Sequence, residues 1–169
     1  MTRAGQDLEL TLAAADDSEA LGARIAAALA PGDVVLLEGA LGTGKTTLVR
    51  GLVAALGGDA CEVCSPTFVL LESYAVNAGA IERVHHADLY RLRGQSVAPL
   101  AEVGLGEALD DPAGVTAVEW PEEWPWLGDA SRHVVRVTLL FRGDARGASV
   151  RWRTRSQESL MTMDRYHRG

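Results

Sequence analysis

The apolar residues in the first third of the chain change from strand spacing to helix spacing across a short glycine-rich stretch. Residues 34–37 form a continuous apolar run between Pro31-Gly32-Asp33 and Gly39, which predicts a buried parallel strand. From residue 48 to residue 56, leucine and valine recur at helical spacing, and Gly57-Gly58 end the run. The pattern therefore predicts a strand, a glycine-rich loop and a helix, in that order.

The rest of the chain carries further patterns of both kinds. Leu8, Leu10 and Leu12 alternate with polar residues, as in a half-exposed strand, and Asp16 and Glu19 have the spacing of a capping box that opens a helix. Further elements are expected as follows: strands at residues 68–74, 81–86 and 115–120, a turn at 77–79, helices at 96–103 and near 106–109, and a hairpin of residues 133–141 and 148–153 around Gly143-Asp144.

The glycine-rich loop contains the only lysine of the chain. Lys45 lies in Gly39-Ala40-Leu41-Gly42-Thr43-Gly44-Lys45-Thr46-Thr47, which has the G-x-x-x-x-G-K-T spacing of a loop whose backbone N–H groups surround nucleotide phosphates. All fifteen other basic residues of the Lys and Arg set are arginines. Lysine places a compact charge on a flexible stem that reaches the β- and γ-phosphates, and the helix N-terminus that follows favours anions. The sequence therefore predicts that residues 39–47 bind a nucleoside triphosphate.

Length and composition extend this picture to the whole chain. With 169 residues, 47% hydrophobic and 23% charged, the chain has the size and composition of one soluble domain. We expect an α/β fold of the P-loop NTPase type, a three-layer sandwich with a mostly parallel central sheet and an antiparallel C-terminal hairpin. This single domain is expected to span residues 1–155, and residues 156–169 are expected to form a short helix or a disordered tail.

The same composition bears on where the protein works. No stretch approaches the roughly 18 apolar residues of a membrane span, and the first residues lack the apolar segment of a signal peptide. With only two cysteines and a nucleotide site, the chain is expected to be cytoplasmic and not to bind a membrane.

Nucleotide hydrolysis also requires a hydroxyl and an acid that bind Mg²⁺. Thr46 follows the lysine and supplies the hydroxyl. Two acids compete for the second role, because Glu119 and Asp88 each end a predicted strand, where α/β sheets bind their ligands. Spacing alone does not rank Glu119 above Asp88.

Three further segments make the identification sharper. They are Ser65-Pro66-Thr67-Phe68, then residues 86–92 with the sequence HADLYRL, then Val118-Glu119-Trp120-Pro121. In this order behind a G-x-L-G-T-G-K-T-T loop, they resemble the TsaE (YjeE) family of bacterial P-loop ATPases. The resemblance extends from about residue 8 to residue 141.

The resemblance implies roles for individual residues. Thr46 and Glu119 would be Mg²⁺ ligands, and Asp88 would have a catalytic role or would orient a catalytic group. Thr67 matches the threonine of a loop similar to the first switch of GTPases, where a hydroxyl senses the γ-phosphate through the metal; the alternative is an ordinary threonine in an extended turn.

Trp120 either contacts the nucleotide beside residues 39–47 or packs in the core. For Arg91, a salt bridge or a partner contact is preferred over a role on transition-state charge.

The resemblance also implies a process and partners. TsaE proteins support threonylcarbamoyladenosine modification of tRNA together with TsaD and TsaB, so we expect an ATPase with cofactors ATP and Mg²⁺. Its ATPase activity would be weak in the isolated protein and stimulated by its partners. The protein would be distinct from the threonylcarbamoyl transferase itself. The alternative is a small-molecule kinase with the same loop, for which only Arg83, Arg91 and Arg93 could serve an acceptor pocket. A GTPase is disfavoured because its N-K-x-D motif needs a second lysine.

Charge bears on whether the protein contacts tRNA. Residues 131–169 carry nine arginines against three acids, a net +6, whereas the whole chain is −7, so residues 1–130 carry −13. A globally acidic protein lacks the basic face that phosphate contacts need. Direct tRNA contact through the arginine-rich end is possible but not favoured.

Overall fold

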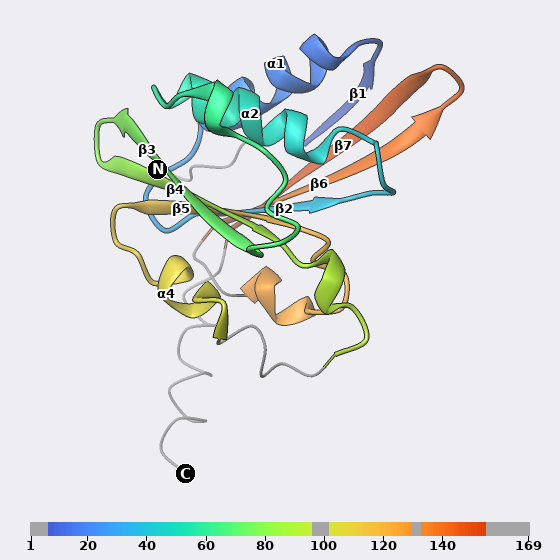
Figure 1. The fold of residues 1–169 in the computed structure, drawn as a ribbon. Coiled ribbons are helices and arrows are strands. Elements are labelled where there is room, and N and C mark those ends of the chain that lie inside the picture. The colour runs from blue at the N-terminus through green and yellow to red at the C-terminus, as the bar shows by residue number, and fades with distance from the viewer. Residues whose placement is uncertain (1–6, 96–101, 130–132, 155–169) are drawn as a thin grey trace.

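The computed structural model describes residues 7–95, 102–129 and 133–154. Seven strands form one sheet in the order β1-β7-β6-β2-β5-β4-β3 (Figure 1). The strands are β1 (Leu8–Leu12), β2 (Val34–Glu38), β3 (Leu71–Ala78), β4 (Ile81–Asp88), β5 (Gly114–Glu119), β6 (His133–Arg142) and β7 (Ala145–Thr154).

The sheet is parallel in its centre and antiparallel toward both edges. Strand β2 pairs in parallel with β5 and β6, and β4 pairs in parallel with β5. The pairs β3–β4, β6–β7 and β1–β7 are antiparallel. The fold is therefore a mixed α/β fold, and the predicted C-terminal hairpin is confirmed as β6 and β7, which project together in Figure 1.

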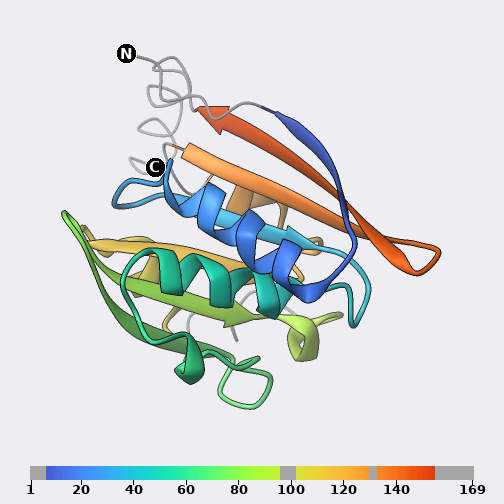
Figure 2. The same ribbon diagram turned by 90° about the horizontal axis from the view of Figure 1, so that it is seen from above.

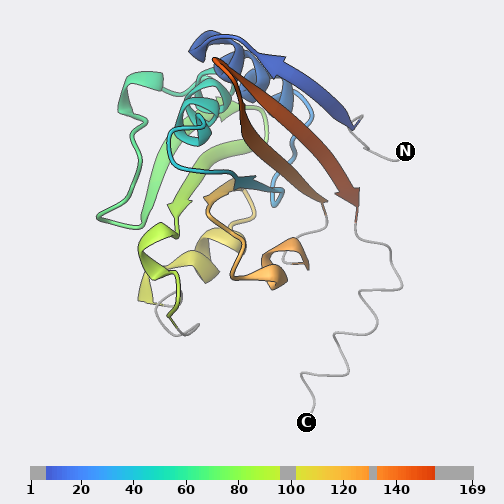
Figure 3. The ribbon, with the colours of Figure 1, turned by 90° about the vertical axis from the view of Figure 1, so that its right-hand side faces the viewer.

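Helices cover the two faces of the sheet unequally. The longer helices α1 (Ala15–Ala26) and α2 (Lys45–Ala55) lie side by side on one face, as the view from above shows (Figure 2). The other face carries α4 (Leu105–Leu109) and the 3₁₀ turns η2 (Tyr90–Leu92) and η3 (Pro125–Asp129) (Figure 3). A third 3₁₀ turn, η1 (Ala60–Glu62), follows α2. No helix in the described part of the chain is long and apolar enough to cross a membrane.

Helices α1 and α2 approach each other through glycine. A Cβ atom on Gly22 would collide with the carbonyl oxygen of Leu48, and one on Gly51 would collide with that of Glu19. The two backbones are thus nearly in contact, which fixes the position of α2, and with it Lys45, relative to α1.

Several sequence predictions need correction at their boundaries. Helix α1 begins at Ala15, so its N-cap is Ala14 and not Asp16. The acid of its capping box is Asp17 and not Glu19, and the Asp17 carboxylate accepts from the N–H groups of Ala13 and Ala14. Strand β3 begins at Leu71, because Phe68 belongs to the preceding turn. The expected helix at 96–103 and the expected tail at 156–169 fall mainly or wholly outside the described residues.

The register of the parallel strands brings two acids together. Asp88 and Glu119 end neighbouring strands β4 and β5 and are directly paired in the ladder. Both residues are 3% exposed and lie at the carboxyl edge of the sheet, next to the loop that follows β2. The fold thereby builds a site where these strands end.

Candidate functional site

The loop between β2 and α2 adopts a conformation that its glycines permit. Gly39 has φ 140° and Gly44 has φ 103°, values that other residues rarely adopt. A Cβ on Gly39 would also collide with the carbonyl oxygen of Leu139 on the neighbouring strand. Thr43 is fully buried and its hydroxyl donates to the carbonyl of Ala40, 2.8 Å away, which ties the loop to itself.

Lys45, the first residue of α2, folds back over this loop. Its ammonium donates to the carbonyl oxygens of Gly39 at 2.6 Å and Ala40 at 3.0 Å. It also lies 3.9 Å from the centre of the Trp120 ring, within range of a cation–π contact. Burial lowers the pKa of Lys45, while the nearby acids Glu119, Glu122 and Asp88 act in the opposite direction. The charge is therefore held at low solvation, where an anionic ligand would interact with it strongly.

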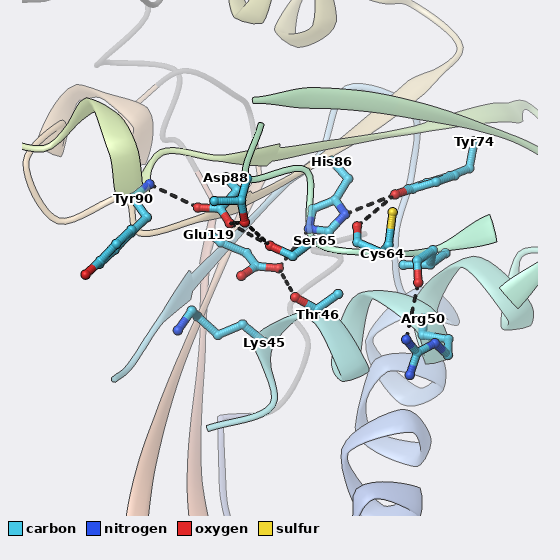
Figure 4. A network of polar contacts seen from close by, with 12 residues as sticks. Lys45, Thr46, Arg50, Cys64, Ser65, Tyr74, His86, Asp88, Tyr90 and Glu119 are labelled. Carbon is cyan, nitrogen blue, oxygen red and sulfur yellow. Dashed lines mark hydrogen bonds and ion pairs between the residues drawn. The ribbon is translucent and has the colours of Figure 1, made fainter. Parts of the chain in front are cut away.

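Thr46 and Glu119 meet across the site. The Thr46 hydroxyl donates to Glu119 Oε1 over 2.7 Å, and the same oxygen lies 2.8 Å from His86 Nε2 (Figure 4). His86 is fully buried. Two groups from two different elements therefore fix one carboxylate oxygen of Glu119.

Asp88 gathers a second set of contacts. Its Oδ2 accepts from the hydroxyls of Ser65 at 2.7 Å and Thr67 at 3.2 Å, and these hydroxyls lie 2.9 Å apart. Its Oδ1 accepts from the backbone N–H of Tyr90 at 3.0 Å. Asp88 thus ties the segment 65–68, called here the 65–68 loop, to the end of β4.

These groups face one cavity of about 360 Å³. It is lined by residues from the glycine-rich loop, both acids, the 65–68 loop, helix α1 and the hairpin: Ala15, Ser18, Leu41, Gly42, Gly44, Lys45, Thr46, Thr47, Ser65, Thr67, Asp88, Tyr90, Glu119, Trp120 and Arg146. The structure therefore brings together nearly all the residues predicted for the site. Gly39, Ala40 and Thr43 do not line the cavity and instead form the inner side of the loop.

An aromatic wall closes one side of the cavity. Trp120 has a positive φ of 61°, uncommon for a bulky residue, and its ring lies 4.9 Å from that of Tyr90. Trp120 also packs against the core cluster beneath α4. The two interpretations of Trp120 are thus compatible, because one residue packs in the core and lines the cavity. Arg91 does not line the cavity; its guanidinium lies 5.3 Å from the exposed ring of Phe68.

Four contributors to the site were not assigned a role from the sequence. The sequence assigns no role to His86 or Tyr74, places Ser65 only within a motif, and places Arg146 only within the arginine-rich end. The alternation of β3 and β4 was an available signal, because it places Tyr74 and His86 on the face of Asp88. No sequence signal places Arg146, which comes from the distant hairpin and donates to the carbonyl of Gly42 at 3.3 Å.

Comparison with known proteins gives one consistent family. A family profile described as "Threonylcarbamoyl adenosine biosynthesis protein TsaE" matches residues 12–146. Curated relatives named tRNA threonylcarbamoyladenosine biosynthesis protein TsaE include one from Synechocystis, 42% identical over 63% of this chain and 65% of the relative. Another from Nostoc is 39% identical over 82% and 81%, and one from Mycobacterium tuberculosis is 34% identical over 84% and 85%. The match to the Synechocystis relative thus spans slightly less than two thirds of that protein's length.

A solved structure has the same fold. The crystal structure of Bacillus subtilis YdiB superposes with a TM-score of 0.61 over 94% of this chain and 93% of YdiB, at 24% identity. The loop, the two acids and the 65–68 loop all fall inside the part that the family profile matches. The chain belongs to the TsaE family.

Proposed function

We propose that this protein binds and hydrolyses ATP with Mg²⁺ and thereby supports the biosynthesis of threonylcarbamoyladenosine in tRNA. The observation that carries the proposal is the meeting of Thr46 and Glu119, 2.7 Å apart, beside Lys45 in one cavity. Membership of the TsaE family supports the role in tRNA modification, and the residues that line the cavity support the binding and hydrolysis of ATP.

Residues 39–47 would hold the phosphates. The ammonium of Lys45 donates to two carbonyl oxygens of its own loop. These oxygens are weaker acceptors for a cation than a phosphate is. A β- or γ-phosphate would replace these contacts and compensate a charge that burial leaves poorly solvated. The N-terminus of α2 adds its free N–H groups on the same side.

The donor set fits Mg²⁺. This ion is commonly held by one or two carboxylates and a hydroxyl together with phosphate oxygens, and it keeps several waters. Thr46 and Glu119 supply the hydroxyl and the carboxylate; among the described residues, no group of three or more His, Cys, Asp or Glu side chains is arranged to hold a metal alone. When bound, the ion would neutralise charge that develops on the β- and γ-oxygens.

Asp88 and Thr67 would act on turnover. Asp88 Oδ2 is occupied by the hydroxyls of Ser65 and Thr67, so it becomes available to a water only when the 65–68 loop moves. A turn of Thr67 toward the γ-phosphate side of the cavity would release one of these contacts. Binding of the triphosphate and exposure of Asp88 would in this way be coupled.

The position of the 65–68 loop suits stimulation by partners. Phe68 is 87% exposed and stacks with Arg91 outside the cavity, where a docked protein would reach the loop without entering the site. We propose TsaD and TsaB as these partners, a cytoplasmic location, slow hydrolysis by the isolated chain and no transferase activity of its own. Direct contact with tRNA remains disfavoured by the acidic net charge of −7.

A hydrolysis assay with and without the TsaD–TsaB pair tests the proposal. We expect slow release of phosphate by the isolated protein and a clear increase in the rate when the pair is added. Thr67→Ala and Arg91→Ala should lower this stimulated rate more than they lower the basal rate. Fast hydrolysis that the pair does not change would contradict the accessory role. Stoichiometric transfer of phosphate to a small metabolite would instead support the kinase alternative.

A further inference from the structure

A chain of polar contacts, buried at Glu119, His86 and Tyr74, runs from the acid of the metal site to the base of the 65–68 loop. Glu119 Oε1 lies 2.8 Å from His86 Nε2, and His86 Nδ1 lies 3.4 Å from the Tyr74 hydroxyl. That hydroxyl donates to the carbonyl of Cys64, 3.3 Å away, and Cys64 directly precedes Ser65. In Figure 4, dashed lines join the Tyr74 hydroxyl to His86 and to Cys64.

The chemistry of these groups fixes which atoms donate. A carboxylate only accepts, so the Nε2 of His86 carries the hydrogen that binds Glu119. In the neutral ring the Nδ1 is then an acceptor. The Tyr74 hydroxyl has one hydrogen and faces two acceptors, the Cys64 carbonyl at 3.3 Å and His86 Nδ1 at 3.4 Å. Two long and nearly equal distances are what one shared hydrogen produces.

The surroundings keep this hydroxyl protonated. Burial raises the pKa of Tyr74 to about 12, so its single hydrogen stays in place at neutral pH. Tyr74 is 4% exposed and His86 is fully buried, so their mutual contact is shielded from water. Movement of Cys64 with the 65–68 loop would leave His86 Nδ1 as the remaining acceptor.

We infer that His86 is a positioning residue that holds the Glu119 carboxylate against Thr46, and that Tyr74 couples this orientation to the 65–68 loop. The inference rests on the proposed Mg²⁺–nucleotide site and adds two residues to it. In a cycle of binding and release, the loop position and the orientation of the metal acid change together, because the Cys64 carbonyl and His86 Nδ1 share the hydrogen of Tyr74, and the same imidazole donates to Glu119.

The measurement is the affinity of a fluorescent, non-hydrolysable ATP analogue in Mg²⁺ and in EDTA. In His86→Met, which cannot donate, we expect the tightening by Mg²⁺ to fall about tenfold, while affinity in EDTA stays within about twofold of the parent. His86→Gln places an amide N–H near the Nε2 position and should restore most of the tightening. If His86→Met does not fold, His86→Asn replaces it, because the shorter amide does not reach Glu119.

Coupling through Tyr74 is tested by a double-mutant cycle. Tyr74→Phe removes only the hydroxyl and should reduce the Mg²⁺ tightening about two- to threefold in the parent but not in His86→Met. Ser73→Ala is the matched control, because its hydroxyl also bonds a histidine Nδ1, that of His85 at 2.7 Å, on the other face of the sheet. It should leave both affinities unchanged.

The outcomes separate this inference from the proposed function. A parent protein whose affinity does not depend on Mg²⁺ would overturn both the metal site and the inference. A parent that tightens with Mg²⁺ while His86→Met tightens equally would overturn the positioning role alone. Equal effects of Tyr74→Phe in both backgrounds would overturn the coupling and leave His86 in place.

Discussion

Two histidines follow each other on β4 and point to opposite faces of the sheet. His86 bonds Glu119 and His85 bonds Asp111, each over 2.8 Å. His86 lies beside the cavity, on the face that α1 and α2 cover. His85 lies on the face of α4, where it also contacts the hydroxyl of Ser73.

The two carboxylates differ in how they are neutralised. Asp111 accepts two bonds from the Arg83 guanidinium, at 2.6 and 2.9 Å, and a third from the N–H of Ala113 at 3.0 Å. Hydrogen bonds from Arg83 hold the pKa of Asp111 well below its usual range. Glu119, in the part of the chain that the structure describes, is hydrogen-bonded only by a hydroxyl and an imidazole. Asp111 is thus bonded directly by a guanidinium that holds it in the fold, whereas Glu119 is bonded by a hydroxyl and an imidazole beside the cavity.

The largest expected effect lies in the cavity. Lys45→Ala should weaken nucleotide binding by about 100-fold or more, because no other lysine exists to replace the lost charge. Equilibrium titration with a fluorescent ATP analogue measures this loss. Arg83→Ala removes a cation from the other face and should leave the affinity unchanged. An affinity of Lys45→Ala equal to that of the wild type would show that Lys45 and its loop do not hold the phosphates.

Turnover should depend on the acid that ties the 65–68 loop. Asp88→Ala should lower the rate of ATP hydrolysis by about 100-fold while leaving nucleotide affinity within a few fold, since its role acts on the reaction. Single-turnover phosphate release together with the binding titration separates the two quantities. An affinity loss as large as that of Glu119→Ala would refute this division of labour.

The matched pair of histidine-bound carboxylates gives the sharpest contrast. Glu119→Ala should abolish most of the tightening of nucleotide binding by Mg²⁺, about tenfold, because Thr46 alone is a poor ligand. Asp111→Ala removes a carboxylate with the same histidine distance and should leave this tightening intact. Both variants are titrated in Mg²⁺ and in EDTA. A similar loss in both would mean that the two faces are not functionally distinct.

The smallest effect is on stability and depends on pH. Because the folded pKa of Asp111 is depressed, its contribution to stability is present above its ordinary pKa of 3.8 and is lost as pH falls toward the folded value. Asp111→Asn should therefore melt a few degrees below the parent at pH 7, on the order of 1–2 kcal/mol, and the gap should narrow below about pH 4. Thermal unfolding followed by circular dichroism at several pH values measures the gap. A gap that is constant from pH 7 to pH 3 would contradict the role of Arg83.

The sequence predicted the parts of the site that local chemistry specifies. The spacing of Lys45 in its loop, the alternation of β1 and the apolar run before the loop all follow from short segments, and the structure contains them. Glu119 and Asp88 were placed at strand ends, yet their direct pairing depends on β4 and β5 being neighbours in the sheet. That order is set by the packing of the whole domain and not by either strand.

The parts that were missed involve long-range contacts or competition at element ends. The bond between His86 and Glu119 joins residues from two strands, and Arg146 reaches the loop from the hairpin. At the start of α1, the predicted pair Asp16 and Glu19 is wrong by two residues, because the helix has Ala14 as its N-cap and Asp17 as the acid of its capping box. Similarly, Phe68 has strong β-propensity but lies in the turn closed by the bond from Leu70 N–H to the Pro66 carbonyl.

The crossing of α1 and α2 has a consequence for anyone who would make this protein more heat-resistant. Replacing a helical glycine by alanine is a standard stabilising change, worth up to about 1 kcal/mol from helix propensity. At Gly22 and Gly51 the added methyl group has no space, because it would meet a carbonyl of the facing helix. The substitution would push α2 outward together with Lys45 and Thr46 at its first turn. A set of stabilising variants chosen by helix propensity alone would thus disturb the nucleotide site through two positions that do not contact it.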